Sequence, residues 1–555
     1  MKDPYASKPW LKHYDKHVPA KLKYPNKPWV VLFTEVVEKV KDRVAIYYAG
    51  VPIPYTELDA MSNKFANFLK EKGLKQGDVV GIQLPNMPAN YISIIGALKA
   101  GCVISGISPL LTEKEMEFQL NNAGAKALVA MDALWGKITP VLPKTGVKMV
   151  ALTSGTDFLP SANKAQGEIT SVPGISVHNY MDILATMPAT PLALNMDINR
   201  NIMLQYTGGT TGVPKGAEII DRGFVTDACQ LARWFDTDKN IGTEVFLSAF
   251  PLYSIAGAAL AFWHLMLGST VIAFPNPRDF AGLAAVIEKH KPTCMCNVPT
   301  ILMELLKLPA FRKIDFSFLK WCISGGAPFP PEFMGDLESV IGKGKLVESL
   351  GMTECGPFIS ATPLYGKKIL GSVGLPVPDT EAKVLDPATG AVVPQGETGE
   401  LIVKGPQTFA RYHNMPEETA NTLRDGWVYT GDIVRMDEEG YFYVVDRLKD
   451  MVNVSGLKVF TRELDDLICQ HPDVAGAASV GIPDPNRPGS EIVVAAVVLK
   501  QGVEKTDNTS KSISEFVRQR AATYKVPKKI VFMEKLPTSS IGKILKRELR
   551  EMMKK

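Results

Sequence analysis

The sequence predicts an α/β protein, and three successive patterns along the chain support this fold class. Apolar runs alternate with amphipathic stretches in the first two thirds, short β-like runs and turns begin at Gly371, and a shorter α/β pattern begins after Lys449. Strands that alternate with helices are typical of parallel sheets covered by helices. We therefore expect a large N-terminal domain of two α/β sheet units with a β-rich subdomain, followed by a small α+β C-terminal domain.

The N-terminal domain is expected over residues 1–447, with its β-rich subdomain at about 370–447. Strands of the sheet units are predicted at Asp78–Leu84, Cys102–Ile107, Lys126–Ala130, Phe246–Phe250, Thr270–Phe274 and Trp321–Ser324. Helices are predicted between them at Ala89–Ala100, Met116–Asn121 and Phe280–Lys289. The β-rich subdomain is predicted from the runs Ala382–Leu385, Gly399–Val403 and Tyr441–Val445.

The C-terminal domain is expected over residues 448–555, a length of about 100 residues that lies within the usual range for a domain. Its predicted helices are Arg462–Gln470 and Ile513–Ala521, and its predicted strands are Ala477–Ile482 and Ile492–Leu499. The chain shows no internal repeat and no low-complexity tract.

Composition excludes several classes of protein. The net charge of +4 over 555 residues is too small for bulk nucleic-acid binding, so no nucleic-acid partner is expected. The 7 cysteines form no C-x-x-C pair, which favours a cytoplasmic protein without structural zinc or disulfides. Residues Val245–Pro277 lack Asp, Glu, Lys and Arg, but Pro251, Gly257 and Gly268 divide them into strand, helix and strand. We expect buried core there and no transmembrane segment; peripheral membrane contact and a homodimer stay open.

A glycine-rich loop between Tyr206 and Gly216 predicts a phosphate site. It follows the apolar run Ile202–Leu204 and contains 4 glycines, 3 threonines and 1 lysine. Glycines allow backbone N–H groups to converge on an anion, while hydroxyls and a lysine ammonium add donors. The residues expected to contact phosphate are Thr207, Gly208, Gly209, Thr210, Thr211, Gly212 and Lys215. A Walker-type NTPase is disfavoured, because Val213 and Pro214 separate Gly212 from Lys215 and Gly216 replaces the hydroxyl residue that binds magnesium.

Six further motifs follow this loop in a fixed order. They are Gly325-Gly326-Ala327-Pro328, Gly351-Met352-Thr353-Glu354, Tyr429-Thr430-Gly431-Asp432, Asp446-Arg447-Leu448-Lys449-Asp450, Gly456-Leu457-Lys458-Val459 and Ser540-Ile541-Gly542-Lys543-Ile544. Together with the loop they resemble the adenylate-forming superfamily of acyl-CoA synthetases, luciferases and peptide-synthetase adenylation domains over nearly the whole chain. Within it, the sequence most resembles medium- and long-chain fatty-acid–CoA ligases.

The resemblance implies a role for each motif. Lys543, Lys215, Thr210 and Glu354 would be catalytic, with Lys543 acting in the first half-reaction and Glu354 holding Mg²⁺. A carboxylate that starts a helix is the alternative interpretation of Glu354. ATP and AMP would contact the phosphate loop and a second set of residues: Gly326, Ala327, Pro328, Leu350, Gly351, Met352, Thr353, Asp432, Arg447 and Lys543.

Within that set, Asp432 would bind the ribose hydroxyls and Arg447 would add a fixed fork to the ribose or phosphate. An aspartate in such a turn is otherwise ordinary turn chemistry. The family is known for rotating its C-terminal domain between two reaction steps, so that this domain would be a mobile lid with its hinge at Lys449. In the second arrangement Gly456, Leu457 and Lys458 would line the coenzyme A tunnel.

Departures from the family pattern bear on the substrate. Ser254 stands where the family has histidine, Leu350 where it has an aromatic residue, and Thr461 where it usually has proline, which is expected to soften the turn after the hinge. Acetate-specific relatives carry tryptophan at Gly351, so glycine is expected to leave room for a larger acyl group. The expected acyl-pocket residues are Trp234, Tyr253, Ser254, Gly325, Gly351 and Phe358, for which core packing is the alternative.

The function implied is an ATP-dependent acyl-CoA ligase for a medium-chain, long-chain or branched fatty acid. It would form acyl-AMP with release of pyrophosphate and then acyl-CoA and AMP, using ATP, Mg²⁺ and coenzyme A. An aryl-carboxylate CoA ligase and an enzyme that loads a carrier protein are the alternatives within the superfamily. A catalytically silent nucleotide or acyl-CoA sensor and a kinase-like NTPase are the alternatives from other classes.

Overall fold

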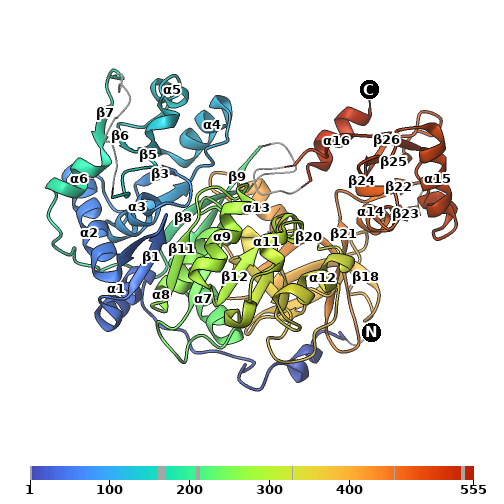
Figure 1. The fold of residues 1–555 in the computed structure, drawn as a ribbon, viewed down its shortest axis with the longest axis horizontal. Helices are drawn as coiled ribbons and strands as arrows, with labels where there is room; N and C mark the ends of the chain where they lie inside the picture. The colour runs from blue at the N-terminus through green and yellow to red at the C-terminus, as the bar shows by residue number, and fades with distance from the viewer. Residues whose placement is uncertain are drawn as a thin grey trace.

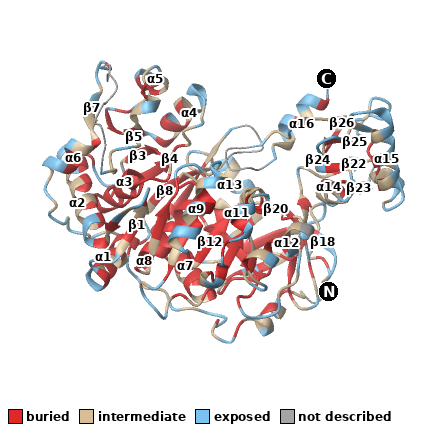
Figure 2. Cartoon of the chain, viewed as in Figure 1, coloured by how far each residue is buried: buried red, intermediate tan, exposed pale blue. Residues whose placement is uncertain are grey.

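A computed structural model describes residues 3–160, 171–207, 213–327, 329–455, 457–538 and 544–554 of the protein. Figure 1 shows two large sheets side by side with helices around them, and a group of C-terminal elements set apart at one end. The predicted α/β class is confirmed. Figure 2 shows that buried residues concentrate on the strands and on the helices that lie between the sheets.

The first sheet has seven strands within the described residues, in the order β7-β6-β5-β3-β4-β8-β9. The strands are β7 (Ser176–Asn179), β6 (Met149–Thr153), β5 (Ala125–Met131), β3 (Val79–Gln83), β4 (Val103–Gly106), β8 (Asn201–Thr207) and β9 (Lys215–Ile220). All neighbouring pairs are parallel except β8 and β9, which form an antiparallel pair at the edge. The predicted strands of this unit, and helices α3 (Pro88–Lys99) and α4 (Glu113–Ala123), are confirmed to within a few residues.

The second sheet has nine described strands, in the order β16-β15-β14-β13-β12-β10-β11-β1-β2. They are β16 (Leu375–Pro376), β15 (Phe358–Ala361), β14 (Leu346–Gly351), β13 (Trp321–Ser324), β12 (Cys294–Asn297), β10 (Val245–Ser248), β11 (Thr270–Ala273), β1 (Val44–Tyr48) and β2 (Val51–Pro54). The strands from β14 to β1 are parallel, so their carboxyl ends meet at one edge. Loops at that edge are the usual place for a ligand site in an open α/β sheet.

Helices between the two sheets make one continuous core. Every residue of α3 is buried, and α8 (Ile255–Met266) is buried at all but one position. Helices α1 (Trp29–Val40), α2 (Tyr55–Glu71) and α7 (Asp221–Trp234) join the same hydrophobic cluster, which reaches strands of both sheets. On the other face of the larger sheet, α9 (Phe280–His290), α10 (Pro299–Leu306) and α12 (Pro331–Ile341) cover a second cluster. The segment without charges therefore folds as β10, α8 and β11, as expected for buried core.

A separate antiparallel sheet follows. It contains β17 (Glu381–Leu385), β18 (Thr398–Lys404), β20 (Trp427–Met436), β19 (Leu423–Arg424) and β21 (Phe442–Arg447), and helix α13 (Pro416–Thr422) lies within it in the sequence. After it come β22 (Val452–Val454), β23 (Leu457–Val459), α14 (Thr461–Cys469), β24 (Val474–Pro483), β25 (Glu491–Leu499), α15 (Asp507–Arg518), β26 (Lys529–Phe532) and α16 (Lys546–Met553). These last elements bury hydrophobic clusters of their own, from Val452 to Met553.

Residues between Trp10 and Tyr24 contact the distant β-rich part of the chain and the segment just before it. Trp10 is 1% exposed and lies against Phe442, with ring centres 6.4 Å apart. Tyr24 donates a hydrogen bond to the Asp379 carboxylate at 2.6 Å, and the backbone N–H of Leu22 donates to the same oxygen at 2.8 Å. The start of the chain therefore ties the edge of the nine-stranded sheet to the β-rich sheet. No periodicity or motif in the sequence predicts this contact.

Candidate active site

The glycine-rich loop joins the antiparallel strands β8 and β9. Thr207 ends β8, Lys215 begins β9, and the two residues are register partners across the pair. The strand pair thus fixes both ends of a short loop at the sheet edge. The loop residues Gly208, Gly209, Thr210, Thr211 and Gly212 lie outside the described residues, so their contacts with phosphate stay a prediction.

Lys215 is held by two groups from one downstream segment. Its ammonium forms an ion pair with the carboxylate of Glu418 on α13 and lies 5.2 Å from the centre of the Tyr412 ring. The Lys215 side chain is 15% exposed, whereas that of Glu418 is 43% exposed. An exposed carboxylate exchanges with another anion at low cost, because water and salt already screen the pair. Lys215 is therefore available to an incoming phosphate.

Glu354 lies in a short 3₁₀ turn, Thr353–Cys355, that follows β14. The residue is 5% exposed. The Tyr412 hydroxyl donates a hydrogen bond to its carboxylate, and the backbone N–H of Phe409 donates to its carbonyl oxygen at 2.9 Å. Burial, and then the nearby Glu354 charge, raises the pKa of Tyr412, so the phenol stays protonated as the donor. The buried Glu354 carboxylate and the Lys215 ammonium therefore share one neighbour, Tyr412.

The segment that carries Tyr412 runs along β9. Tyr412 forms an isolated antiparallel bridge with Ala217, and the backbone N–H of His413 donates to the carbonyl oxygen of Gly216 at 2.8 Å. Glu218 on the same strand pairs with Arg411 at 3.0 Å and with His413 at 2.8 Å. This segment contributes functional neighbours that the sequence analysis missed, since Arg-Tyr-His matches no catalytic pattern used there.

The site is suited to a magnesium ion only together with a nucleotide. Among the described residues no group of three or more His, Cys, Asp or Glu side chains could hold a metal ion. Magnesium in nucleotide enzymes is commonly held by one or two carboxylates plus substrate phosphates. The single buried carboxylate of Glu354, which shares the neighbour Tyr412 with the Lys215 ammonium, fits that donor set. Its role as a metal ligand stays a prediction.

The predicted adenine residues lie at the carboxyl edge of the nine-stranded sheet. Gly325, Gly326 and Ala327 directly follow β13, and Leu350 and Gly351 end the neighbouring strand β14. Gly326 has φ +81°, a left-handed backbone that glycine adopts without strain. The two motifs are far apart in sequence but leave adjacent parallel strands at the same edge. Pro328 lies outside the described residues.

Gly351 has a backbone reason to be glycine. A Cβ atom there would lie 1.9 Å from the carbonyl oxygen of Pro357, and the backbone N–H of Met352 donates to that oxygen at 2.9 Å. The space where a side chain would start is therefore filled by backbone. The expectation that glycine opens the acyl pocket is not needed to explain this residue and stays a prediction.

Asp432 and Arg447 form the best-defined polar pair of the site. They are register partners on β20 and β21, and Arg447 Nε lies 2.6 Å from Asp432 Oδ1. The Asp432 side chain is 1% exposed. Its other oxygen, Oδ2, is buried without a hydrogen-bond partner in the described part of the chain. A buried carboxylate oxygen that lacks a donor is costly, so this atom points to a ligand that supplies one.

Asp432 and Glu354 belong to one neighbourhood. Burial raises the pKa of the Cys355 thiol well above its usual value, and the negative charges of Glu354 and Asp432 raise it further. Because such charge effects fall off with distance, both carboxylates lie near Cys355. Glu354, Asp432 and Asp227 therefore lie within electrostatic range of Cys355.

Lys449, the predicted hinge residue, lies at the edge of this site. Its pKa is lowered to about 8, first because its ammonium loses hydration and then because of the charge of Arg447, although the residue as a whole keeps contact with solvent. Asp432 and Lys215 also act on it. The predicted hinge residue therefore lies within electrostatic range of Asp432 and Lys215.

Thr461 anchors the C-terminal elements to β21. It is 0% exposed, and its backbone N–H and hydroxyl both donate to the buried carboxylate of Asp446, the hydroxyl at 3.1 and 3.2 Å from the two oxygens. Lys546 on α16 donates to the Thr461 hydroxyl at 2.7 Å and to Asp465 at 2.8 Å. A proline in this position could not donate to Asp446 from its nitrogen. The expectation that threonine softens this turn stays a prediction.

Ser254, which replaces the family histidine, caps a helix. Its hydroxyl accepts a hydrogen bond from the backbone N–H of Gly257 at 3.2 Å and donates to the carbonyl oxygen of Pro251 at 2.7 Å. Serine is one of the favoured N-cap residues. The substitution therefore fixes the start of α8, and a role for Ser254 in the acyl pocket stays a prediction.

The other expected pocket residues are held by packing. The Trp234 indole N–H donates to the carbonyl oxygen of Thr362 at 3.1 Å, and the Tyr253 carbonyl oxygen accepts from the Gln205 amide at 2.6 Å. Phe358 is 5% exposed, and its backbone N–H donates to Asp227 at 3.4 Å. A Cβ on Gly325 would lie 2.8 Å from the Ser349 hydroxyl oxygen. These contacts explain the residues as core, so their pocket role stays a prediction.

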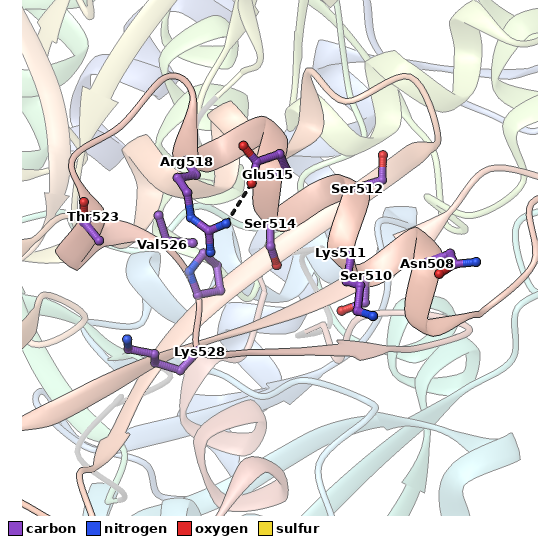
Figure 3. A pocket seen from close by; sticks show the side chains of 11 residues that line it. Asn508, Ser510, Lys511, Ser512, Ser514, Glu515, Arg518, Thr523, Val526 and Lys528 are labelled. Carbon is purple, nitrogen blue, oxygen red and sulfur yellow. Dashed lines mark hydrogen bonds and ion pairs between the residues drawn. The ribbon is translucent and has the colours of Figure 1, made fainter.

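Other predicted residues fall outside this cluster. Leu457 is 50% exposed on β23, and Lys458 beside it is exposed. Gly456 and Lys543 lie outside the described residues. Figure 3 shows a polar pocket lined by α15 and by the segment 523–528, where Arg518 pairs with Glu515 at 2.7 Å. None of the predicted site residues lines this pocket. No helix in the described ranges is long and apolar enough to cross a membrane.

Comparison with known proteins agrees with this arrangement. The family model described as AMP-binding enzyme matches residues 33–413, and the model for the C-terminal domain of AMP-binding enzymes matches residues 463–543. The chain therefore belongs to the AMP-binding enzyme family, and the resemblance inferred from its motifs is confirmed.

Individual relatives match over nearly their full length. The long-chain-fatty-acid–CoA ligase of Bacillus subtilis (strain 168) is 36% identical over 557 residues, which cover 98% of both chains. The long-chain-fatty-acid–CoA ligase of Salmonella typhimurium (strain LT2) is 35% identical over 564 residues, again 98% of both. The crystal structure of ATP-bound MatB from Rhodopseudomonas palustris is similar with a TM-score of 0.84 at 27% identity, over 95% of this chain and 99% of that chain.

Proposed function

We propose that the protein is an ATP-dependent, AMP-forming acyl-CoA ligase that acts on a fatty acid. The observation that carries the proposal is one site in which Asp432 offers an unpaired buried oxygen and Tyr412 links Lys215 to Glu354. A nucleotide supplies the matching groups: ribose hydroxyls for Asp432 and phosphate oxygens for Lys215. The curated relatives at 36% and 35% identity, both long-chain-fatty-acid–CoA ligases, support the acid and the thiol.

The reaction needs ATP because a carboxylate has no adequate leaving group. The carboxylate oxygen attacks the α-phosphorus of ATP, and the bond to pyrophosphate breaks, which gives acyl-AMP. The thiolate of coenzyme A then attacks the acyl carbon and AMP departs with the bonding electron pair. Both steps bring anions together, so fixed cations and donors are expected to supply most of the rate.

We assign a different part of the bound nucleotide to each of the described residues. Lys215 neutralises charge on the β- and γ-phosphates once Glu418 is displaced. Glu354 would hold Mg²⁺, which when bound neutralises phosphate charge. Asp432 and Arg447 bind the ribose, and the turn from Gly325 to Ala327 and residues Leu350 and Gly351 flank adenine. The ATP-bound structural relative supports ATP as the nucleotide.

We also propose that the chain divides into domains at 1–447 and 448–555, with a β-rich subdomain at about 370–447 and the hinge at Lys449. Support comes from the separate hydrophobic clusters after Val452. Lys543 would act in adenylation, and Gly456 to Lys458 would serve the thiol step after the C-terminal domain rotates. Ser254, Trp234 and Phe358 lie near the start or end of elements that would border the acyl chain.

An assay of substrate range tests the proposal. Release of AMP and pyrophosphate from ATP and Mg²⁺ is measured with acetate, octanoate, palmitate, 2-methylbutyrate and benzoate, with and without coenzyme A. CoA-dependent AMP and thioester with octanoate or palmitate is the expected result. Turnover with benzoate alone would favour the aryl-acid alternative, and pyrophosphate release that is independent of coenzyme A would favour delivery to another acceptor.

A further inference from the structure

Tyr412 contacts both charged groups of the phosphate side of the site. It is 4% exposed and packs edge-on against Phe409, with ring centres 4.9 Å apart. Its hydroxyl donates to Glu354, 58 residues earlier in the chain, and its ring face lies 5.2 Å from the Lys215 ammonium. The residue therefore stands between an anion and a cation that come from different elements.

Each contact has a separate physical effect. A hydrogen bond from the hydroxyl fixes the orientation of a buried carboxylate and occupies one of its two oxygens, which leaves the other for a second partner. The face of an aromatic ring attracts a cation and can hold an ammonium without neutralising it. The Glu418 side chain that pairs with Lys215 is 43% exposed, whereas the Tyr412 ring that contacts the same ammonium belongs to a buried residue.

The position of Tyr412 is itself fixed by the backbone. Tyr412 forms a backbone bridge with Ala217 on β9, and its N–H donates a hydrogen bond to the Thr419 hydroxyl at 3.0 Å. The N–H of the neighbouring Phe409 donates to the Glu354 carbonyl oxygen. Because the Tyr412 backbone is fixed in this way, its hydroxyl and its ring face have fixed positions and can orient the side chains that they contact. A phenylalanine would fill the same volume but could not donate to Glu354.

We propose that Tyr412 is a positioning residue that orients the Glu354 carboxylate through its hydroxyl and holds the Lys215 ammonium through its ring. This inference rests on the proposed function, because it assigns Glu354 to the metal and Lys215 to the phosphates of a bound nucleotide. The two contacts are separable by substitution, since Tyr412→Phe removes the hydroxyl alone and Tyr412→Leu removes the ring as well.

The test measures binding and turnover in the full chain. Dissociation constants for ATP are determined calorimetrically with Mg²⁺ and with EDTA, and kcat and KM for Mg·ATP are measured with the preferred acid. Tyr412→Phe is expected to weaken only the Mg²⁺-dependent part of ATP binding, by roughly 10- to 100-fold as for other residues that orient metal ligands. Tyr412→Leu is expected also to weaken binding in EDTA, because Lys215 loses its support.

A double substitution separates positioning from general damage. Tyr412→Phe combined with Glu354→Gln is expected to bind Mg·ATP no more weakly than Glu354→Gln alone, because the hydroxyl acts through that carboxylate. The matched control is Tyr441→Phe, which removes another buried tyrosine hydroxyl, one that donates to the Lys367 carbonyl oxygen at 2.7 Å. It is expected to leave both dissociation constants unchanged.

The outcomes distinguish the two claims. If the wild-type protein neither binds Mg·ATP nor forms AMP with any acid, the proposed function fails and the inference fails with it. If the wild type is active but Tyr412→Phe binds Mg·ATP normally, or its effect adds fully to that of Glu354→Gln, the inference about Tyr412 is overturned while the proposed function stands.

Discussion

Arg447 holds one oxygen of the buried Asp432 carboxylate at 2.6 Å and leaves the other, Oδ2, without a donor among the described residues. The pair lies across β20 and β21, so the backbone of a sheet fixes its geometry. A residue that only stabilised the fold would gain from pairing both oxygens. The half-paired state is what a ribose-binding carboxylate requires before its ligand arrives.

Asp432→Asn tests this interpretation with deoxynucleotides. The wild type is expected to bind 2′-deoxy-ATP or 3′-deoxy-ATP at least about tenfold more weakly than ATP, since a hydrogen bond to a charged group contributes roughly 1.5–3 kcal/mol. Asp432→Asn is expected to bind ATP more weakly and to lose most of that discrimination. Equilibrium dissociation constants for the three nucleotides measure this discrimination, and Asp425→Asn, at an exposed position, is the control. Unchanged discrimination in Asp432→Asn would contradict the assignment.

Lys543→Ala tests the assignment of the first half-reaction, which rests on the family resemblance. Loss of a cation that bridges carboxylate and phosphate is expected to slow formation of acyl-AMP by roughly 100-fold or more. Formation of the thioester from supplied acyl-AMP should survive. Single-turnover assays of each half-reaction measure this, and Lys529→Ala, on an exposed part of β26, is the control. Equal loss in both half-reactions would rule out two arrangements of the C-terminal domain.

Thr461→Pro and Thr461→Val test the link between β21 and α14. Valine keeps the shape but removes the hydroxyl, and proline also removes the N–H, so the buried Asp446 carboxylate loses one or both of the donors that Thr461 supplies and keeps the one from the Arg447 N–H. Each change is expected to lower the free energy of unfolding by about 1–3 kcal/mol, with proline the more costly. Urea unfolding measures it, with Thr523→Val on an exposed turn as control. Equal stability of all variants would show that the contact does not hold the two elements together.

His264 predicts a pH dependence of stability. It is 0% exposed on α8, its Nδ1 lies 2.9 Å from the Leu260 carbonyl oxygen, and burial lowers its pKa to about 4. Between that value and the ordinary value near 6.5 the unfolded chain binds more protons at this residue. The contribution of His264 to the free energy of unfolding therefore falls as pH drops through this window and is constant above it.

The size of that effect follows from the shift. The free energy of unfolding is expected to fall by on the order of 3 kcal/mol between about pH 6.5 and pH 4 because of this residue. Thermal unfolding across that range measures it in the wild type, in His264→Phe and in the control His13→Gln. His264→Phe should lack this part of the slope; an unchanged slope would show that His264 does not titrate on unfolding.

Sequence reasoning works where information is local. Alternating patterns predicted β3, α3 and β13 to within a few residues, because apolar periodicity and turn residues act over short stretches. The order of the motifs predicted the protein family, which the comparisons confirm. The meeting of Lys215 and Glu354 at Tyr412 depends on two strands and a return of the chain after β18, and no local pattern encodes it.

The departures from the family pattern show the same limit. Ser254 and Thr461 looked like losses when compared position by position, but the structure shows a helix cap and a two-donor contact to Asp446. The short polar N-terminal stretch carries no periodic signal that would single out Trp10 and Tyr24. Both nevertheless contact residues more than 350 positions away. The roles of such residues depend on tertiary contacts, which the sequence does not show.

Transfer of oxygen from the acid to AMP tests the central claim most directly. The preferred acid, labelled with ¹⁸O in its carboxylate, is converted with ATP, Mg²⁺ and coenzyme A, and the nucleotide product is analysed by mass spectrometry. Attack of the carboxylate on the α-phosphorus predicts one ¹⁸O atom in each AMP formed, together with unlabelled pyrophosphate. ADP with ¹⁸O in inorganic phosphate, or AMP without label, would contradict an acyl-adenylate intermediate.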